Sequence, residues 1–222
     1  MSILSKLQAL LTAANTKTGE SDTTLTDAMQ TLVDGYGQGG GDDTMGQYLA
    51  NTLTNYSNDT ITNIPQYGFA YASNLVELSI PNVELIGAYA FMNTGMKKLV
   101  IHKTVRLDGW QIFSKMTNLE ELDIMNVISS QQQLFSDSVK MSVLIIRDTN
   151  NILTLVNNTN VFNNTPFASG KSGGTLYVPQ SLISSYQSAT TWSTILGYEN
   201  NQILPIEGSQ YENYYADGTA IS

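Results

Sequence analysis

The side chains that most often carry catalysis or bind metal ions are scarce in this chain of 222 residues. It contains one histidine, His102, and no cysteine, so a Ser-His-Asp triad or a histidine general base would have to use His102. The lack of cysteine excludes disulfide scaffolds, zinc bound by thiolates and thiol nucleophiles. Because His102 follows an expected strand and has no second ligand near it in the sequence, we predict no metal site and no cofactor.

Three acidic residues, Glu120, Glu121 and Asp123, lie close enough together to suggest a pair of catalytic carboxylates. In a strand, side chains alternate between two faces, so Glu121 and Asp123 share the outward face, where both are expected to be solvated. A general acid needs a pKa raised by burial or by a close like charge, and the sequence indicates no burial here. We therefore predict no catalytic residues and no enzymatic activity.

The segment 169–172, Ser-Gly-Lys-Ser, resembles the end of a phosphate-binding loop. That loop requires a glycine at position 165, where this chain has Thr165, and a helix after it, where residues 175–178 favour a strand. We interpret the segment as a Gly/Ser loop that binds no nucleotide.

The charged residues indicate which partners the chain can have. With 10 basic and 19 acidic residues the net charge is −9, which repels phosphate backbones and excludes nucleic acid as a partner. No apolar run approaches the ~20 residues that span a bilayer, so we predict no membrane contact. Several basic residues gather near one expected strand, either as a site for acidic polymers or as a solvated segment balanced by nearby acids, and we favour the second; they are Lys97, Lys98, His102, Lys103 and Arg106.

The chain divides into four expected parts. Residues 1–36 predict a helical hairpin whose apolar stripes have no core of their own, so we interpret it as an anchoring and oligomerisation module. Residues 37–45 form a Gly-rich linker, residues 46–207 a repeat domain with a C-terminal cap that includes Trp192, and residues 208–222 a polar tail. The candidate assembly residues of the hairpin are Leu7, Leu10, Leu11, Met29, Leu32 and Val33.

From about residue 60 the chain repeats itself. Four similar blocks begin at residues 75, 96, 119 and 141, at steps of 21, 23 and 22 residues. Phenylalanine recurs every 22 residues at Phe69, Phe91, Phe113 and Phe135. One repeat cannot bury its apolar side, but stacked repeats share a core. The fold class is therefore an α/β repeat solenoid with a short parallel sheet, whose last strand is expected at 175–178.

The outward positions of the expected strands form the candidate partner-binding face. These positions change from coil to coil while the inward Leu and Ile recur, and several are apolar where water is expected. One interpretation is a recognition surface; the other is that the tail or the N-terminal hairpin covers them, and the sequence leaves both open. The residues are Ser79, Val100, Asp123, Ile145 and Tyr177, with Lys98 and Glu121 beside them.

Two resemblances add to these expectations. Residues 75–91, Leu-Val-Glu-Leu-Ser-Ile-Pro-Asn-Val-Glu-Leu-Ile-Gly-Ala-Tyr-Ala-Phe, resemble the pattern of the BspA-like (treponemal-type) leucine-rich repeat family, and the likeness extends over roughly 60–207. It implies a repeat solenoid without catalytic residues. Separately, residues 13–29 resemble a short leader of phage and prophage structural proteins of Firmicutes, where the leader precedes assorted surface modules.

Together, the resemblances lead us to expect a non-enzymatic virion structural protein of the tail-fibre, head-fibre or decoration type, assembled in the host cytoplasm. The hairpin would bind other virion proteins and form a homo-oligomer, a trimer being one option. The solenoid would attach to a glycan or protein of the host cell surface. The alternative is a BspA-like leucine-rich repeat adhesin on a bacterial cell surface.

Overall fold

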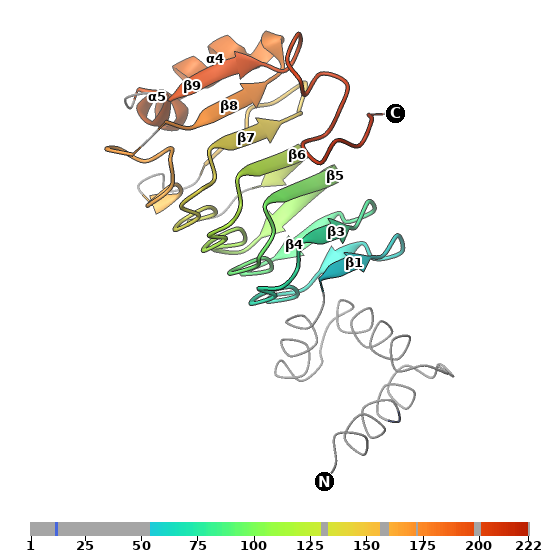
Figure 1. Ribbon diagram of the computed structural model, residues 1–222. Helices are drawn as coiled ribbons and strands as arrows, with labels where there is room; N and C mark the ends of the chain where they lie inside the picture. The colour runs from blue at the N-terminus through green and yellow to red at the C-terminus, as the bar shows by residue number, and fades with distance from the viewer. Residues whose placement is uncertain are drawn as a thin grey trace.

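The computed structural model (Figure 1) describes Thr12 and residues 54–129, 133–155, 160–171, 173–197 and 201–221. Apart from Thr12, the predicted hairpin lies outside the described residues, and so do its six candidate assembly residues. The Gly-rich linker lies outside them as well. The structural account therefore concerns the repeat domain and the tail.

The repeat domain is a stack of coils in which every named strand pair is parallel, as the repeat predicts. One sheet has the order β2-β4-β5-β6-β7-β8-β9, and a separate pair joins β1 to β3. The strands are β1 (Asn55–Ser57), β2 (Asn63–Ile64), β3 (Glu77–Ser79), β4 (Leu85–Gly87), β5 (Lys98–Asp108), β6 (Glu121–Ser129), β7 (Val143–Ile146), β8 (Thr175–Val178) and β9 (Gln202–Pro205).

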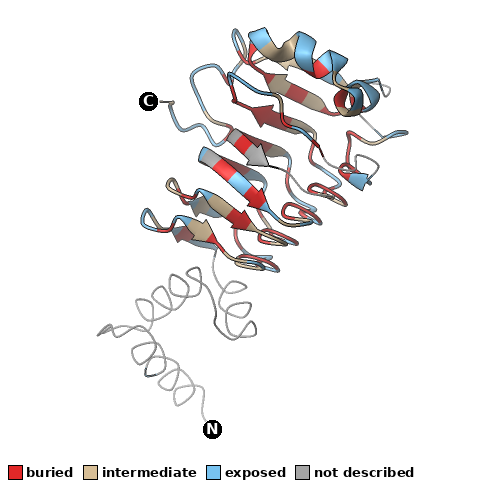
Figure 2. Cartoon of the chain, turned by 180° about the vertical axis from the view of Figure 1, so that it is seen from behind, coloured by how far each residue is buried: buried red, intermediate tan, exposed pale blue. Residues whose placement is uncertain are grey.

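The strands follow two lines along the stack. The first strand line carries β1, β3, the first half of β5, the first half of β6, and β7 to β9; the second carries β2, β4 and the second halves of β5 and β6. Alternation places leucines of successive coils on the inward side of the first line, where Leu99, Leu122 and Leu144 are buried. Figure 2 shows buried positions recurring along the strands from the opposite side.

A column of phenylalanines runs through the core and confirms the 22-residue period. Phe69, Phe91, Phe113 and Phe135 stack in near-parallel pairs, with ring centroids 5.6, 5.7 and 5.8 Å apart. Phe162 continues the column at 5.0 Å from Phe135, although its position breaks the 22-residue period. Each coil thus covers the aromatic ring of its neighbour, which is how a repeat without its own core becomes stable.

The cap covers the last coils with short helices, as expected around Trp192. It consists of a 3-10 turn (Gln180–Leu182), α4 (Ile183–Ser188) and α5 (Thr190–Leu196). The buried indole N–H of Trp192 donates to the carbonyl of Leu153 at 2.7 Å, and the N–H of Leu153 donates to the hydroxyl of Tyr186 at 2.9 Å. Burial raises the pKa of Tyr186.

The expectation that residues 175–178 form the last strand is wrong. Strand β9 pairs in register with β8, and the N–H of Gln202 donates to the carbonyl of Gly174 at 2.9 Å. The sequence Gln-Ile-Leu-Pro gave little sign of a strand because proline cannot donate to a ladder. In β9, Pro205 ends an edge strand, where that N–H is not required.

Candidate recognition face

The structure brings together most of the predicted outward residues. Val100, Asp123, Ile145 and Tyr177 are successive partners across β5, β6, β7 and β8. Lys98 and Glu121 are partners in the neighbouring row, with Nζ and Oε1 3.0 Å apart. Ser79 stands apart, because β3 pairs with β1 and not with β5.

The C-terminal tail lies across this face, as Figure 1 shows in red beside β5 to β8. Ile206, Tyr211 and Ala216 form a second apolar cluster with the outward side chains of Val100 and Ile145. Of the two interpretations left open by the sequence, coverage by the tail is the one found. The expectation of exposure is wrong for Val100, Asp123 and Ile145, which are 5%, 0% and 0% exposed.

Tyr177 and Glu121 are less completely covered. Tyr177 is half-buried and meets the ring of Tyr211 edge to face, with centroids 4.9 Å apart. The Tyr211 hydroxyl donates to Oε2 of Glu121 at 3.2 Å. Burial and the negative charge of Glu121 raise the pKa of Tyr211 to about 12. Tyr177 and Glu121 therefore both contact the docked tail.

A buried ion pair fastens the tail to the sheet. Nε and Nη2 of Arg147 donate to the two carboxylate oxygens of Asp123 at 2.7 and 2.8 Å. Nη1 and Nη2 of Arg147 also donate to the carbonyls of Tyr211 and Tyr214, each at 2.9 Å. The N–H of Ala216 donates to Oδ2 of Asp123 at 3.0 Å. The pair therefore makes two hydrogen bonds within itself and three to the tail backbone.

Asp123 corrects the expectation of a solvated carboxylate. Its burial raises the pKa of the carboxyl, while the Arg147 guanidinium and the Ala216 N–H oppose that rise. Because Asp123 is completely buried under the tail and both of its oxygens are bound by Arg147, a substrate cannot reach the carboxylate in this structure. Its burial serves the attachment of the tail and is not that of a general acid.

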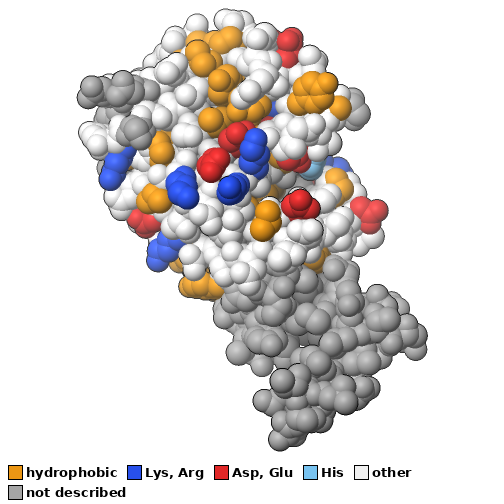
Figure 3. Space-filling model, viewed as in Figure 1, with side chains coloured by type: hydrophobic (Ala, Val, Ile, Leu, Met, Phe, Trp, Pro, Cys, Tyr) orange, Lys and Arg blue, Asp and Glu red, His pale blue; other side chains and the backbone are white. Residues whose placement is uncertain are grey.

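Three of the basic residues near β5, Lys98, Lys103 and Arg106, are paired with acids, as the favoured interpretation holds. Lys103 lies 3.5 Å from Glu84, and Arg106 lies 3.1 Å from Asp108. His102 packs edge to face against Tyr215, at 4.7 Å between centroids. Figure 3 shows Lys and Arg side chains intermixed with Asp and Glu on this face, so no broad surface of one charge sign is present there.

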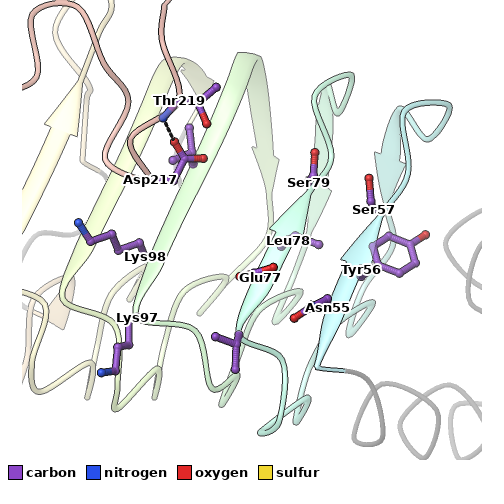
Figure 4. Close-up of a pocket in the computed structure, with 12 residues that line it drawn as sticks. Asn55, Tyr56, Ser57, Glu77, Leu78, Ser79, Lys97, Lys98, Asp217 and Thr219 are labelled. Carbon is purple, nitrogen blue, oxygen red and sulfur yellow. Dashed lines mark hydrogen bonds between the residues drawn. The ribbon is translucent and has the colours of Figure 1, made fainter.

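An open groove of about 840 Å³ lies beside the tail, and the sequence did not predict it. Its floor is formed by β1 and β3, and its far wall by the start of β5 and the tip of the tail (Figure 4). Ser79, Lys98 and Val100 are the predicted face residues that line it. The complete lining is Asn55, Tyr56, Ser57, Val76, Glu77, Leu78, Ser79, Lys97, Lys98, Val100, Asp217 and Thr219.

The described residues offer neither a metal-binding cluster nor a membrane-spanning helix. Within the described ranges, no group of three or more His, Cys, Asp or Glu side chains could hold a metal ion. No helix in that part of the chain has the length and apolar character needed to cross a bilayer. After the Gly/Ser loop the chain enters strand β8, not the helix that a phosphate-binding loop requires.

Comparison with known proteins identifies the repeats. The family described as BspA type leucine rich repeat region matches residues 48–169, in six copies. No curated protein and no solved structure matches the chain. The matched stretch contains the strands that form the floor and far wall of the groove, whereas the tail lies outside it.

Proposed function

The chain belongs to the BspA-type leucine-rich repeat family, and on that premise we propose that it is a non-enzymatic attachment module. The observation that carries the proposal is the groove, which lies beside the tail and is lined by β1, β3 and the start of β5. Ser57, Val76 and Ser79 on its floor are exposed. In our proposal these exposed positions contact a molecule of the host cell surface.

We further propose that a phage or prophage particle carries the module. The support is the resemblance of residues 13–29 to a leader of phage structural proteins, together with the apolar stripes predicted for residues 1–36. In this proposal the N-terminal residues bind other virion proteins and hold several copies together, so that many weak contacts act at once. The alternative, an adhesin of a bacterial surface, uses the same solenoid with a different carrier.

Two exposed valines provide a matched test of the attachment site. Val76 lines the groove and is 56% exposed, whereas Val139 lies on another coil outside the groove lining and is 50% exposed. Val76→Arg places a long charged side chain in the groove and should weaken binding of the full chain to host envelopes by about tenfold. Val139→Arg should bind like the wild type, and neither substitution should shift the melting temperature appreciably.

The outcomes separate the two parts of the proposal. Wild-type binding by Val76→Arg would move the site away from the groove, and no binding of the wild type to envelopes would reject attachment. Fractionation of an induced culture tests the carrier: the chain should sediment with phage particles. Recovery on the surface of uninfected cells instead would support the adhesin.

A further inference from the structure

We propose that the groove binds an extended peptide of the partner, which adds as a strand to the open edges of β3 and β5. This inference rests on the attachment function proposed above and names the chemistry of its partner. It begins from a break in the sheet: along the first strand line β1 pairs with β3 and β5 pairs with β6, but β3 does not pair with β5.

The break is local and the surrounding coils hold it open. On the second strand line the same two coils remain paired, with Leu85 opposite Arg106 and Ile86 opposite Leu107. In the core, Phe91 stacks on Phe69 and on Phe113 at ordinary spacing. The coils are therefore fastened to each other on the far side, so that the opening is built into the native structure and does not require a partner to form it.

Backbone groups of both strands point into the opening. Glu77 and Ser79 direct their groups toward β1, since the N–H of Glu77 donates to Thr54 at 3.3 Å and the carbonyl of Ser79 accepts from Asn58 at 2.9 Å. Alternation then directs the N–H and C=O of Leu78 toward β5. No described strand pairs with that edge of β3.

The edge of β5 that faces β3 also directs backbone groups into the opening. The carbonyl of Lys97 accepts the N–H groups of Glu120 and Glu121 in the next coil, at 2.7 and 3.3 Å. The backbone groups of Lys98 and Val100 therefore point the other way, toward β3. Unpaired strand edges are templates for pairing with another chain, and here two such edges face each other across one groove.

The side chains around the opening indicate what kind of peptide fits. Leu78 is only partly buried, although its equivalents Leu99 and Leu122 are fully buried, so an inward side chain of the peptide can pack against it. Glu77 and Lys97 are exposed on opposite walls, and within the described residues neither forms a salt bridge. The preferred peptide alternates apolar residues with polar ones that include both charge signs.

The tail shows that the adjacent face already holds a polypeptide through its backbone. Lys98 and Arg147 donate to tail carbonyls, and Asp123 accepts a tail N–H. The tip of the tail then supplies Asp217 and Thr219 to the groove wall (Figure 4). A paired row of backbone donors and acceptors fits a peptide better than a glycan, whose hydroxyls do not repeat at the strand spacing.

Hydrogen exchange on the full chain tests the geometry directly. The amide of Leu78 should exchange much faster than that of Glu77 in the free protein, since only Glu77 donates within the sheet. Peptides of about ten residues, selected from a random displayed library on the full chain and then synthesised, should slow exchange at Leu78 by about tenfold or more and leave Glu77 unchanged.

Methylation of peptide nitrogens provides the matched control. N-methyl groups on alternate residues in one register remove the N–H groups that pair with β3, and the same groups one residue along remove those that pair with β5, so both forms should weaken binding by about tenfold. An N-methyl group on a residue added beyond the paired segment should change binding little. Val76→Arg should lose the peptide and Val139→Arg should retain it. Absence of enriched peptides, or unchanged affinity of both methylated forms, would overturn the inference.

Treated envelopes distinguish this inference from the attachment function. Binding of the full chain should be lost after protease treatment of the envelope and survive periodate oxidation of its glycans. Loss after periodate with survival after protease would identify a glycan and overturn strand addition while leaving attachment intact. Peptide binding as described, without any envelope binding, would reject the attachment function alone.

Discussion

The role of a charged side chain depends on which segment covers it, as the pair of Asp123 and Arg147 shows. On the strand, Asp123 occupies an outward position like that of Glu121, which remains partly exposed. The tail removes Asp123 and Arg147 from water and supplies backbone partners in exchange. Taking two charges out of water is costly, and the cost is offset only when nearly every donor and acceptor is satisfied, as it is here.

Removing one member of this pair should therefore strongly lower the stability of the folded chain. Asp123→Asn leaves the Arg147 guanidinium buried without a counter-charge and should lower the free energy of unfolding by about 3–5 kcal/mol. The control is Asp108→Asn, at an exposed pair with Arg106, which should cost about 1 kcal/mol or less. Both are measured by urea unfolding; equal costs would show that the tail does not bury the pair in solution.

Tyr211 makes tail docking sensitive to alkali. Its pKa is raised from 10 to about 12 in the folded chain, so the folded state favours the neutral phenol more than the unfolded state does. The stability gained from this group is complete below pH 10 and is lost as pH rises through 12. Thermal melting should fall over that window in the wild type and fall less in Tyr211→Phe. Parallel curves for the two proteins would contradict this assignment.

At the scale of the element, the phenylalanine column links the coils. Each ring contacts the rings of both neighbours, so a gap affects three coils at once. The turns on either side of the column adopt a left-handed backbone at non-glycine residues that also recur every 22 positions. They are Tyr67, Tyr89, Gln111 and Gln133 in one row and Tyr71, Asn93, Lys115 and Asp137 in the other. Hydrogen bonds between coils, such as Tyr89 N–H to Trp110 at 2.9 Å, hold them.

Truncation in the column should be costly. Phe113→Ala removes a fully buried ring with a stacked neighbour on each side and should reduce the free energy of unfolding by about 3–5 kcal/mol. Tyr71→Ala, at a ring that is 40% exposed, should cost far less. Denaturant unfolding measures both, and a change within about 0.5 kcal/mol for Phe113→Ala would show that the stack does not exist in solution.

At the scale of the whole molecule, the described residues form one continuous stack, closed at one end by the cap and crossed by the tail. Each coil contacts mainly the next, so the stack can be stable without any partner. Oligomerisation remains a prediction from the sequence. The sequence assigns it to residues 1–36, whose apolar stripes lie outside the described residues and whose role stays a prediction.

Deletion of residues 1–36 tests that role. The remaining solenoid should fold, keep its melting temperature and scatter light as a monomer, because the described strand pairs and the phenylalanine column all lie within residues 54–221. The full chain should be larger than a monomer in the same experiment. An oligomer of unchanged size after deletion would place the association surface on the solenoid, where the exposed edges of the groove would be the first candidate.

The sequence alone determined the period, the parallel arrangement and the inward residues of the repeat domain. This was possible because the contacts of a solenoid join residues about 22 positions apart, as Phe91 and Phe113 do, so the periodicity of the sequence carries the periodicity of the contacts. Only the tertiary structure shows that the C-terminal tail covers the outward face of the sheet. Asp123 accepts a hydrogen bond from Ala216, and Val100 and Ile145 join Tyr211 in one apolar cluster. No repeat in the sequence indicates these distant contacts. The groove is decided in the same way, because it arises where β3 and β5 fail to pair although the repeat continues through both.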